Sequence, residues 1–404
     1  MRYAKAGTIA TGIAVTGAAA FWLWRHQGDV FSRPPLSRWT FTHMDAVMPT
    51  ETVSAAPTAT RPWAVAPVDL SGFRYRHEGR ERSLGDLHRR TGTTGFVVVN
   101  RGRIVHEEYP GTFAGPGRRF QLFSITKSVT SLLVGIACER GLVTLDTMVS
   151  DVLSSFTGTA YGETTVDELL QMSSGVGDVE DWTSPDALIN RFETAVTGGG
   201  AVIDLVRAAS RSDRAGQEFN YSTIDSHILG LVLEEVAGMP LARWAQQELW
   251  RPLGAEHDAY YFLTRGRPRH ALAGGSFNAT LRDIARVGQL VLDDGVVGAH
   301  RVVSESWIER CHRPLYPGHA VGELGVSGYP HYGYSTQWWL VGDRPAAITG
   351  LGVYGQYLWI DPASQTVIVR TATWPTPDDE VRDAETYAAF CALCAHLQTD
   401  ADDE

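Results

Sequence analysis

The sequence predicts an α/β fold in which both ends of the chain build one sheet and an all-α region is inserted between them. Residues 95–109 (GFVVVNRGRIVHEEY) hold two β-branched runs around an Asn-Arg-Gly turn, which is typical of a hairpin. Helical patterns fill most of residues 124–255. Residues 356–372 (QYLWIDPASQTVIVRTA) again indicate two strands, followed by the helical pattern ETYAAFCALCAHL. This order favours a sheet with helices around it and a cleft beside the helical region.

The N-terminal segment predicts a signal or a membrane anchor within residues 1–24. Residues 6–24 carry no charge, follow Arg2 and Lys5, and are about long enough to cross a bilayer once as a helix. Small residues at 18–20 (AAA) fit a cleavage site of a secretory signal instead. A buried helix of the folded domain is the third interpretation. The anchor and the cleaved signal both place the body of the chain outside the cytoplasm. In either case only this segment contacts the membrane.

The rest of the chain indicates one folded domain with a lead-in. Residues 25–70 are rich in Pro, Ser and Thr, which predicts an extended segment. A chain of 404 residues is long enough for one large domain with an ample core. We therefore expect the domain to cover residues 71–400, with the helical insertion at about 145–255.

Composition argues against several classes of protein. The formal charge of −11 and the pI near 5.6 disfavour a nucleic-acid partner, because such binders normally present a basic face. Cys391, Cys394 and His396 lie close together in the last helical pattern, but a metal site needs more converging ligands. We expect packed core thiols there and no metal. Nothing in the sequence indicates a nucleotide, haem or other cofactor.

One lysine stands out in the stretch FSITKSVTSLLVGIA, residues 123–137. Of the 35 lysine and arginine residues, only Lys5 and Lys127 are lysines. As a helix, the stretch has a polar stripe that includes Ser124 and Lys127 one turn apart. Its other stripe is apolar and predicted to be buried: Ile125, Val129, Leu132, Leu133 and Ile136.

This spacing predicts a nucleophilic serine with a lysine base. A serine hydroxyl is a poor nucleophile until its proton is removed. Burial lowers the pKa of a lysine, so Lys127 can be neutral and accept that proton, whereas arginine stays protonated. Ser124 begins the helix, where free N–H groups stabilise a developing anion. The alternative is that Ser124 is only a helix cap.

Two further segments supply candidate partners. Tyr221, in EFNYSTIDSHIL (218–229), lies just before a helical pattern, where a phenol can relay a proton. A packed tyrosine is the alternative. TGLGVYGQYLWIDP (349–362) has glycines just before a strand, which allow the backbone to approach a ligand closely. An N–H group there can complete an oxyanion hole with that of Ser124, although a plain glycine-rich turn fits equally well.

Together these motifs resemble the serine β-lactamase and penicillin-binding-protein superfamily, in which Ser-x-x-Lys precedes a Tyr-x-Asn-type motif and a Lys-Thr-Gly-type strand. Within it, the chain is similar to the 6-aminohexanoate-dimer (nylon-oligomer) hydrolases and related carboxylesterases. The likeness covers nearly all of the chain after residue 35, through SRWTFTHMDAVMP (37–49), FSITKS, TVDELLQMSSGV, EFNYS, LRDIARVGQLVLDDG, QWW and GLGVYGQYLWIDP. It implies a β-lactamase/transpeptidase-like fold, with an antiparallel sheet flanked by helices.

The resemblance also implies a role for each matching position. Ser124 is the acylated nucleophile, Lys127 its base and Tyr221 the motif tyrosine. The N–H groups of Ser124 and Val353 form the oxyanion hole. The positions implied to bind the substrate are Trp339, Asp178, Tyr354 and Gly352.

Three departures from the family patterns bear on the substrate. The lactamase asparagine two residues after Tyr221 is replaced by Thr223. Gly350-Leu351-Gly352 stands in place of Lys-Thr-Gly, which removes the cation that receives a β-lactam carboxylate. Asp178 stands about where the nylon-dimer enzymes carry a tyrosine.

We therefore predict a serine hydrolase that cleaves a small-molecule ester or linear amide through an acyl-enzyme. An ester is the easier substrate, because an alcohol leaves more readily than an amine. The alternatives are a non-catalytic, penicillin-binding-like sensor or binding module, and a D-Ala-D-Ala peptidase or β-lactamase.

Overall fold

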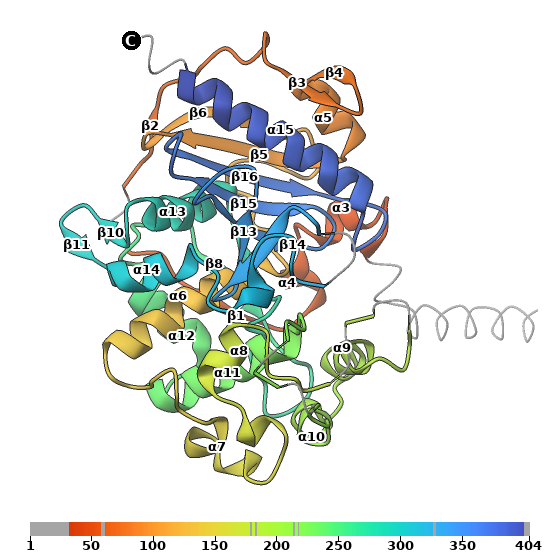
Figure 1. The fold of residues 1–404 in the computed structure, drawn as a ribbon, viewed down its shortest axis with the longest axis vertical. Coiled ribbons are helices and arrows are strands. Elements are labelled where there is room, and N and C mark those ends of the chain that lie inside the picture. The colour runs from red at the N-terminus through yellow and green to blue at the C-terminus, as the bar shows by residue number, and fades with distance from the viewer. Residues whose placement is uncertain are drawn as a thin grey trace, which may run out of the picture.

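The structure, a computed structural model, describes residues 32–57, 61–177, 180–181, 184–212, 215–216, 218–325 and 329–399. Its central sheet has eight strands (Figure 1). In spatial order they are β12 (Tyr332–Ser335), β13 (Trp338–Val341), β14 (Ile348–Gly352), β15 (Gln356–Asp361), β16 (Thr366–Ala372), β5 (Thr93–Asn100), β6 (Arg103–Glu108) and β2 (Ala64–Val65). Neighbouring strands are antiparallel, except that β2 runs parallel to β6.

Both predicted hairpins are confirmed. The turn between β5 and β6 places Arg101 and Gly102 at φ 51° and 72°, the left-handed conformation of a tight hairpin turn. Strands β15 and β16 form the second hairpin, and β16 pairs with β5 from Thr366↔Asn100 onward. Both ends of the chain therefore build one sheet, as the sequence predicts.

Helices cover both faces of the sheet. Strand β5 alternates between two core clusters, with Val97 and Val99 on one face and Phe96 and Val98 on the other. Helices α6 (Ile125–Glu139) and α13 (Leu281–Leu292) pack on the Val97 face. Helices α5 (Leu84–Arg90) and α15 (Glu380–Thr399) cover the Phe96 face, and Figure 1 shows α15 lying across the strands. The predicted C-terminal helix is thus confirmed.

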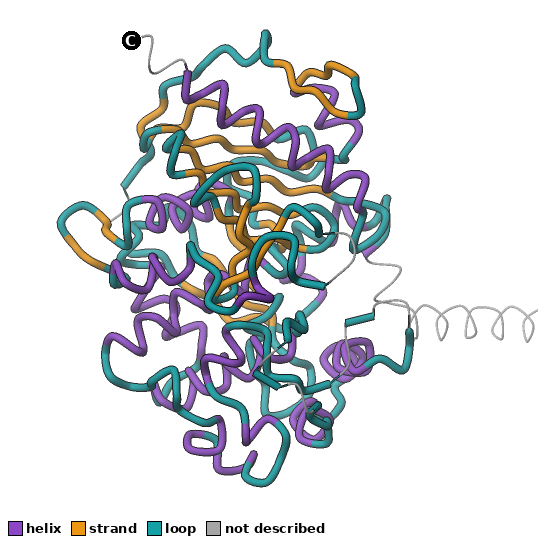
Figure 2. The backbone as a smooth tube through the Cα atoms, viewed as in Figure 1, coloured by secondary structure: helices purple, strands orange, loops and turns teal. Residues whose placement is uncertain are grey.

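The described residues between β7 (Phe120–Gln121) and β8 (Ala259–Phe262) form helices and loops without a strand. Figure 2 shows these helices gathered below the strands of the sheet. After α6, they are α7 (Val149–Val152), η1 (Ser154–Phe156), η2 (Tyr161–Glu163), α8 (Val166–Leu170), α9 (Leu188–Gly198), α10 (Val202–Arg207), α11 (Thr223–Ala237), α12 (Leu241–Ala245) and η3 (Gln246–Trp250).

Short elements complete the fold. A second sheet has the order β1 (Thr50–Val53), β8, β9 (Phe277–Ala279) and β7. Two separate strand pairs are β3 (Arg74–His77) with β4 (Arg80–Ser83) and β10 (Val296–Val297) with β11 (His300–Arg301). The remaining helices are α14 (Glu305–Cys311) and η4 (Pro317–His319).

Residues 32–57 differ from the extended lead-in predicted over 25–70. They contain α3 (Ser37–Thr40), α4 (Met44–Val47) and β1, which pairs with β8. The carbonyl of Phe41 accepts a hydrogen bond from the N–H of Gln121, and the Phe41 ring packs on Phe123 at 4.8 Å. Contacts with distant residues order this segment, and local composition does not report such contacts.

The predicted signal or anchor at residues 6–24 lies outside the described residues and stays a prediction. Within the part of the chain that the structure describes, no helix combines the length and the apolar character that a bilayer crossing requires.

Candidate active site

Helix α6 brings Ser124 and Lys127 together. Nζ of Lys127 lies 2.8 Å from Oγ of Ser124. The predicted apolar stripe is entirely buried, which fixes the rotation of the helix and turns Lys127 into the protein, where it is 1% exposed. Ser124 occupies the N-cap position of α6, but its side chain makes no capping hydrogen bond. The Ser124 hydroxyl therefore faces the lysine amine and does not act as a helix cap.

The surroundings of Lys127 suit a neutral amine. Besides Ser124 Oγ, its Nζ lies 2.9 Å from the carbonyl oxygen of Gly274 and 3.0 Å from Oγ1 of Thr223. A neutral amine has two N–H donors and one lone pair. It can donate to Gly274 and Thr223 and accept the hydroxyl hydrogen of Ser124, so that all three contacts are satisfied without a charge.

Burial and two carboxylates set the pKa of Lys127. Burial lowers this pKa to about 8, and the negative charges of Glu180 and Asp225 act in the opposite direction. Near neutral pH, a useful fraction of Lys127 is therefore unprotonated. An arginine at this position would remain charged.

The backbone before Ser124 is held in an unusual conformation. Phe123 has a φ of 48°, in the left-handed region that costs a non-glycine residue about 1–2 kcal/mol. Aromatic rings pack against Phe123 from two sides, Phe41 at 4.8 Å and Tyr354 at 5.4 Å. Strain of this kind concentrates at functional sites, where surrounding packing sustains it. Here it positions the residue that starts α6.

Tyr221 lies directly beside this pair. Its ring centre is 4.8 Å from Nζ of Lys127, and its hydroxyl lies near enough to the Ser124 side chain for that side chain to lower the pKa of the phenol. Desolvation raises the pKa of Tyr221 above its ordinary value, although the Ser124 side chain opposes this rise. The phenol is therefore protonated at neutral pH. It lies beside the same hydroxyl as the lysine, and its role as a proton relay stays a prediction.

The glycines of β14 allow this strand to lie against the start of α6. A Cβ atom on Gly352 would lie 2.6 Å from the carbonyl oxygen of Leu122, and one on Gly350 would lie 3.0 Å from Oγ of Ser128. A side chain at either position would push the strand away. The close approach brings Val353 and Ser124 to the wall of the same cavity.

This cavity has a volume of about 490 Å³. Trp339 and Gly352 line it, and their predicted role in binding the substrate stays a prediction. Tyr354 packs on Phe41 and Phe123 and is not among the lining residues, so its role stays a prediction. The predicted Asp178 lies outside the described residues. Acidic side chains line much of the wall: Glu180, Asp378, Asp379, Glu380 and Asp383.

Sequence reasoning missed four residues around Lys127. Thr223, which stands at the lactamase asparagine position, contacts the lysine and also donates hydrogen bonds to Glu180. Oγ1 of Thr223 donates to Glu180 Oε2 at 3.2 Å, and its N–H donates to Glu180 Oε1. Glu180 lies two residues after Asp178, so the segment MSSGVGDVEDW did signal an acidic contribution. The carbonyl of Gly274 gave no sequence signal.

The fourth missed residue is Asp225, in the first turn of α11. Its Oδ1 accepts hydrogen bonds from Tyr161 and Ser174, each at 2.9 Å. Burial raises the pKa of Asp225 to about 7, while these hydrogen bonds lower it. The sequence placed this aspartate in a helical pattern, but its proximity to Lys127 depends on how α11 packs against α6.

Known proteins share this fold. The β-lactamase family pattern matches residues 77–392, and the chain therefore belongs to the β-lactamase family. It is similar to the 6-aminohexanoate-dimer hydrolase of Paenarthrobacter ureafaciens, with 29% identity over 359 residues that cover 87% of this chain and 88% of the relative.

Solved structures show the same fold. A Bacillus anthracis protein assigned as a 6-aminohexanoate-dimer hydrolase superposes with a TM-score of 0.82 at 24% identity, covering 91% of this chain and 96% of that one. A family VIII carboxylesterase superposes with a TM-score of 0.57 at 17% identity, covering 76% and 95%. The predicted β-lactamase/transpeptidase-like fold and the predicted family are thus confirmed, and the protein is a serine hydrolase.

Proposed function

We propose that the protein cleaves a small ester or a linear amide through an acyl-enzyme on Ser124, with Lys127 as the base and Tyr221 as the proton relay. The observation that carries this proposal is the 2.8 Å contact between Oγ of Ser124 and the buried Nζ of Lys127. The other two polar contacts of this amine are with the carbonyl oxygen of Gly274 and with Oγ1 of Thr223.

Acylation begins with attack of Ser124 Oγ on the substrate carbonyl carbon, while the hydroxyl proton passes to Nζ of Lys127. The carbonyl oxygen becomes an oxyanion, which the N–H groups of Ser124 and Val353 stabilise. Lys127 returns the proton through the Tyr221 hydroxyl to the leaving oxygen or nitrogen, and the bond to the leaving group breaks. Water then attacks the acyl-enzyme and gives a proton to the same pair. The pair passes this proton to Oγ of Ser124 as the acyl bond breaks, which releases the acid and restores the free hydroxyl.

Ester cleavage is the better supported reaction. An alkoxide or phenolate leaves with little protonation, whereas an amine must be protonated before it leaves. The charge of the cavity wall also argues against the alternative hypothesis of a β-lactamase. Its described residues include five acids and neither a lysine nor an arginine, so a β-lactam carboxylate finds no cation there.

Intact-mass spectrometry of the purified full chain tests the proposal. The enzyme is mixed with p-nitrophenyl esters, linear amides and penicillins, and a fluorophosphonate probe reports the reactive serine. We expect acyl adducts and turnover with esters, probe labelling of the natural sequence, and neither in Ser124→Ala. Absence of both adducts and labelling would support a non-catalytic binding module, and rapid turnover of penicillins would support a β-lactamase.

A further inference from the structure

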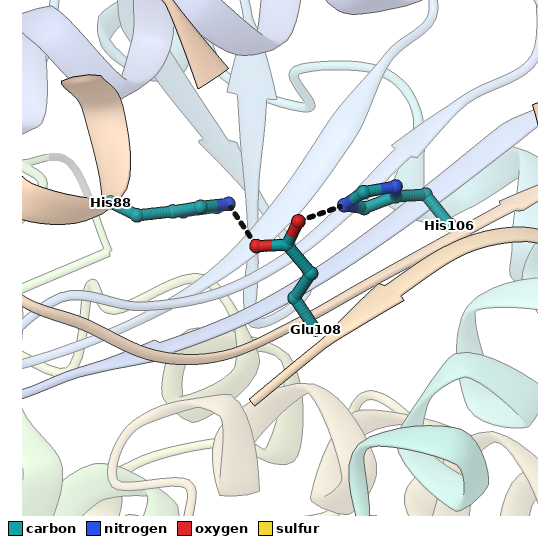
Figure 3. A group of neighbouring side chains, drawn as sticks. All are labelled: His88, His106 and Glu108. Atoms are coloured by element: carbon teal, nitrogen blue, oxygen red, sulfur yellow. Dashed lines mark ion pairs between the residues drawn. The ribbon is translucent and has the colours of Figure 1, made fainter. Parts of the chain in front are cut away.

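Three side chains with metal-binding atoms converge at a place outside the cavity that Ser124 lines. His88 comes from helix α5, and His106 and Glu108 come from strand β6. In Figure 3 the two imidazole rings point at the Glu108 carboxylate from opposite sides. Nε2 of His88 lies 3.4 Å from Oε2 of Glu108, and Nε2 of His106 lies 3.2 Å from Oε1. One ligand atom from each residue lies within 4.8 Å of the others.

We propose that His88, His106 and Glu108 bind a divalent transition-metal ion, and that zinc is the ion that suits them best. Two imidazole nitrogens and one carboxylate are ligands that zinc takes in proteins, with water in the fourth position. This site is separate from the proposed ester or amide hydrolysis, because none of its residues lines the cavity beside Ser124.

The fold explains why the three residues meet. His106 and Glu108 are two residues apart on β6, and successive side chains of a strand alternate between faces, so both point to the same side of the sheet. His106 pairs with Val98 of β5, which belongs to the core cluster under α15. Helix α5 covers that same face and brings the His88 ring to 5.0 Å from the ring of Phe96.

Hydrogen bonding does not account for this arrangement. His88 is 7% exposed, and within the described residues neither of its ring nitrogens has a hydrogen-bond partner. Nε2 of His106 is also buried without one. Both imidazole nitrogens lie within ion-pair distance of the Glu108 carboxylate, as the dashed lines in Figure 3 mark, but neither makes a hydrogen bond there. Buried polar atoms are normally hydrogen-bonded, so these nitrogens remain able to bind a metal ion.

The spacing matches that of zinc ligands. Two ligand atoms about 2.0–2.1 Å from a tetrahedral zinc ion are roughly 3.3–3.4 Å apart. The two observed nitrogen–oxygen separations are 3.2 and 3.4 Å, each to a different oxygen of Glu108, so small side-chain rotations would bring one atom from each residue to this spacing. The Glu108 side chain is 46% exposed, which leaves a path for an ion and its water. A bound ion would fasten helix α5 to strand β6, so it should raise thermal stability.

Zinc titration of the full chain tests this proposal. The protein is first purified in the presence of a chelator, which is then removed. Competition with a chromophoric chelator measures affinity and stoichiometry, and Co²⁺ absorption reports the ligand type. The informative variants are Glu108→Gln and His106→Gln, with His300→Gln on the exposed hairpin β10–β11 as the matched control. Turnover of a p-nitrophenyl ester shows that each variant is folded.

We expect one zinc ion per chain in the natural sequence and in His300→Gln, with a rise in Tm on adding zinc. In Glu108→Gln and His106→Gln, the affinity for zinc should fall about tenfold or more, and the rise in Tm on adding zinc should be lost. Both variants should keep their ester turnover. Unchanged affinity in these two variants, or no zinc uptake by the natural sequence, would overturn the proposal. Zinc binding is measured without any substrate, and ester hydrolysis should persist in the zinc-free protein. Failure of the zinc proposal can therefore be distinguished from failure of the proposed function.

Discussion

Glu180 and Lys127 are connected through a single hydroxyl group, that of Thr223. Oγ1 of Thr223 lies 3.2 Å from Oε2 of Glu180 and 3.0 Å from Nζ of Lys127. Burial lowers the pKa of the lysine and the Glu180 charge raises it, so the two effects oppose each other. The outcome, about 8, lies close enough to neutrality for a base that must be uncharged.

This balance predicts the pH dependence of ester hydrolysis. Lys127 is the base only when it is deprotonated, so kcat/KM should rise as the pH rises through about 8 and then level off. Well below this pH, the rate should fall about tenfold for each pH unit, in proportion to the neutral fraction. Initial rates with an uncharged p-nitrophenyl ester, corrected for spontaneous hydrolysis, measure the profile. A profile that is flat through this range would contradict Lys127 as the base.

Removing the Glu180 charge should move that profile. Glu180→Gln keeps an oxygen that can accept from Thr223 but removes the charge that raises the pKa of Lys127. The rising limb of kcat/KM should therefore shift to lower pH. The exposed Glu163 supplies a matched control, Glu163→Gln, which should leave the profile unchanged. A limb that stays in place in Glu180→Gln would show that this carboxylate does not tune the base.

Substitutions at the nucleophile and its base should have unequal effects. Ser124→Ala should abolish turnover and fluorophosphonate labelling, because no other hydroxyl occupies this position. Lys127→Arg keeps the positive charge but cannot accept a proton, so kcat should fall by about 10²–10⁴. Circular dichroism and Tm serve as folding controls. Substantial activity in the arginine variant would remove the argument for proton transfer to Lys127.

The parts of the site that the sequence predicts are those determined by local geometry. Ser124 and Lys127 are one turn apart on a helix whose apolar stripe fixes its rotation, so their contact follows from spacing alone. Gly274 contacts Lys127 across 147 residues, and the charge of Asp225 raises the pKa of Lys127 because α11 packs on α6. No local pattern encodes such distances. The acidic character of the segment around Asp178 was visible, but which acid contacts Thr223 depends on the path of the loop.

The same distinction applies to the fold. The hairpin at 95–109 was predictable because its turn and its β-branched runs are adjacent, whereas the pairing of β1 with β8 joins residues about two hundred positions apart. Residues 32–57 therefore looked extended, although Phe41 packs against the strained Phe123 beside the nucleophile. The metal-binding candidates escaped notice for a similar reason. His88 lies on a helix and His106 and Glu108 on a strand, and only the sheet brings them together.

Tyr221→Phe should separate ester from amide cleavage. The phenol is protonated at neutral pH and contacts Ser124, so it can deliver a proton to the leaving group. An anilide or alkyl amide needs that proton, whereas p-nitrophenolate leaves without it. We expect kcat for the amide to fall at least tenfold more than kcat for the p-nitrophenyl ester. Equal decreases in kcat for both substrates would mean that Tyr221 acts in the attack of Ser124 or only in packing. Tyr334, whose ring lies 6.1 Å from that of Tyr221 and which is not among the residues that line the cavity, supplies Tyr334→Phe as a control for packing.

The charge of the cavity wall predicts which acyl chains the enzyme prefers. Five acids line the cavity, and one of them, Asp378, accepts a hydrogen bond from Tyr329 at 2.8 Å. Consider p-nitrophenyl esters of equal chain length that end in an ammonium, a methyl or a carboxylate group. The carboxylate ester should be the poorest, with kcat/KM about tenfold or more below the ammonium ester at low salt. The difference should shrink as ionic strength rises, since screening weakens charge interactions at the cavity mouth. Asp378→Asn should narrow the difference at low salt while leaving the methyl-ended ester unchanged. A preference for the carboxylate ester would mean that a cation, and not this acidic wall, faces the bound acyl chain.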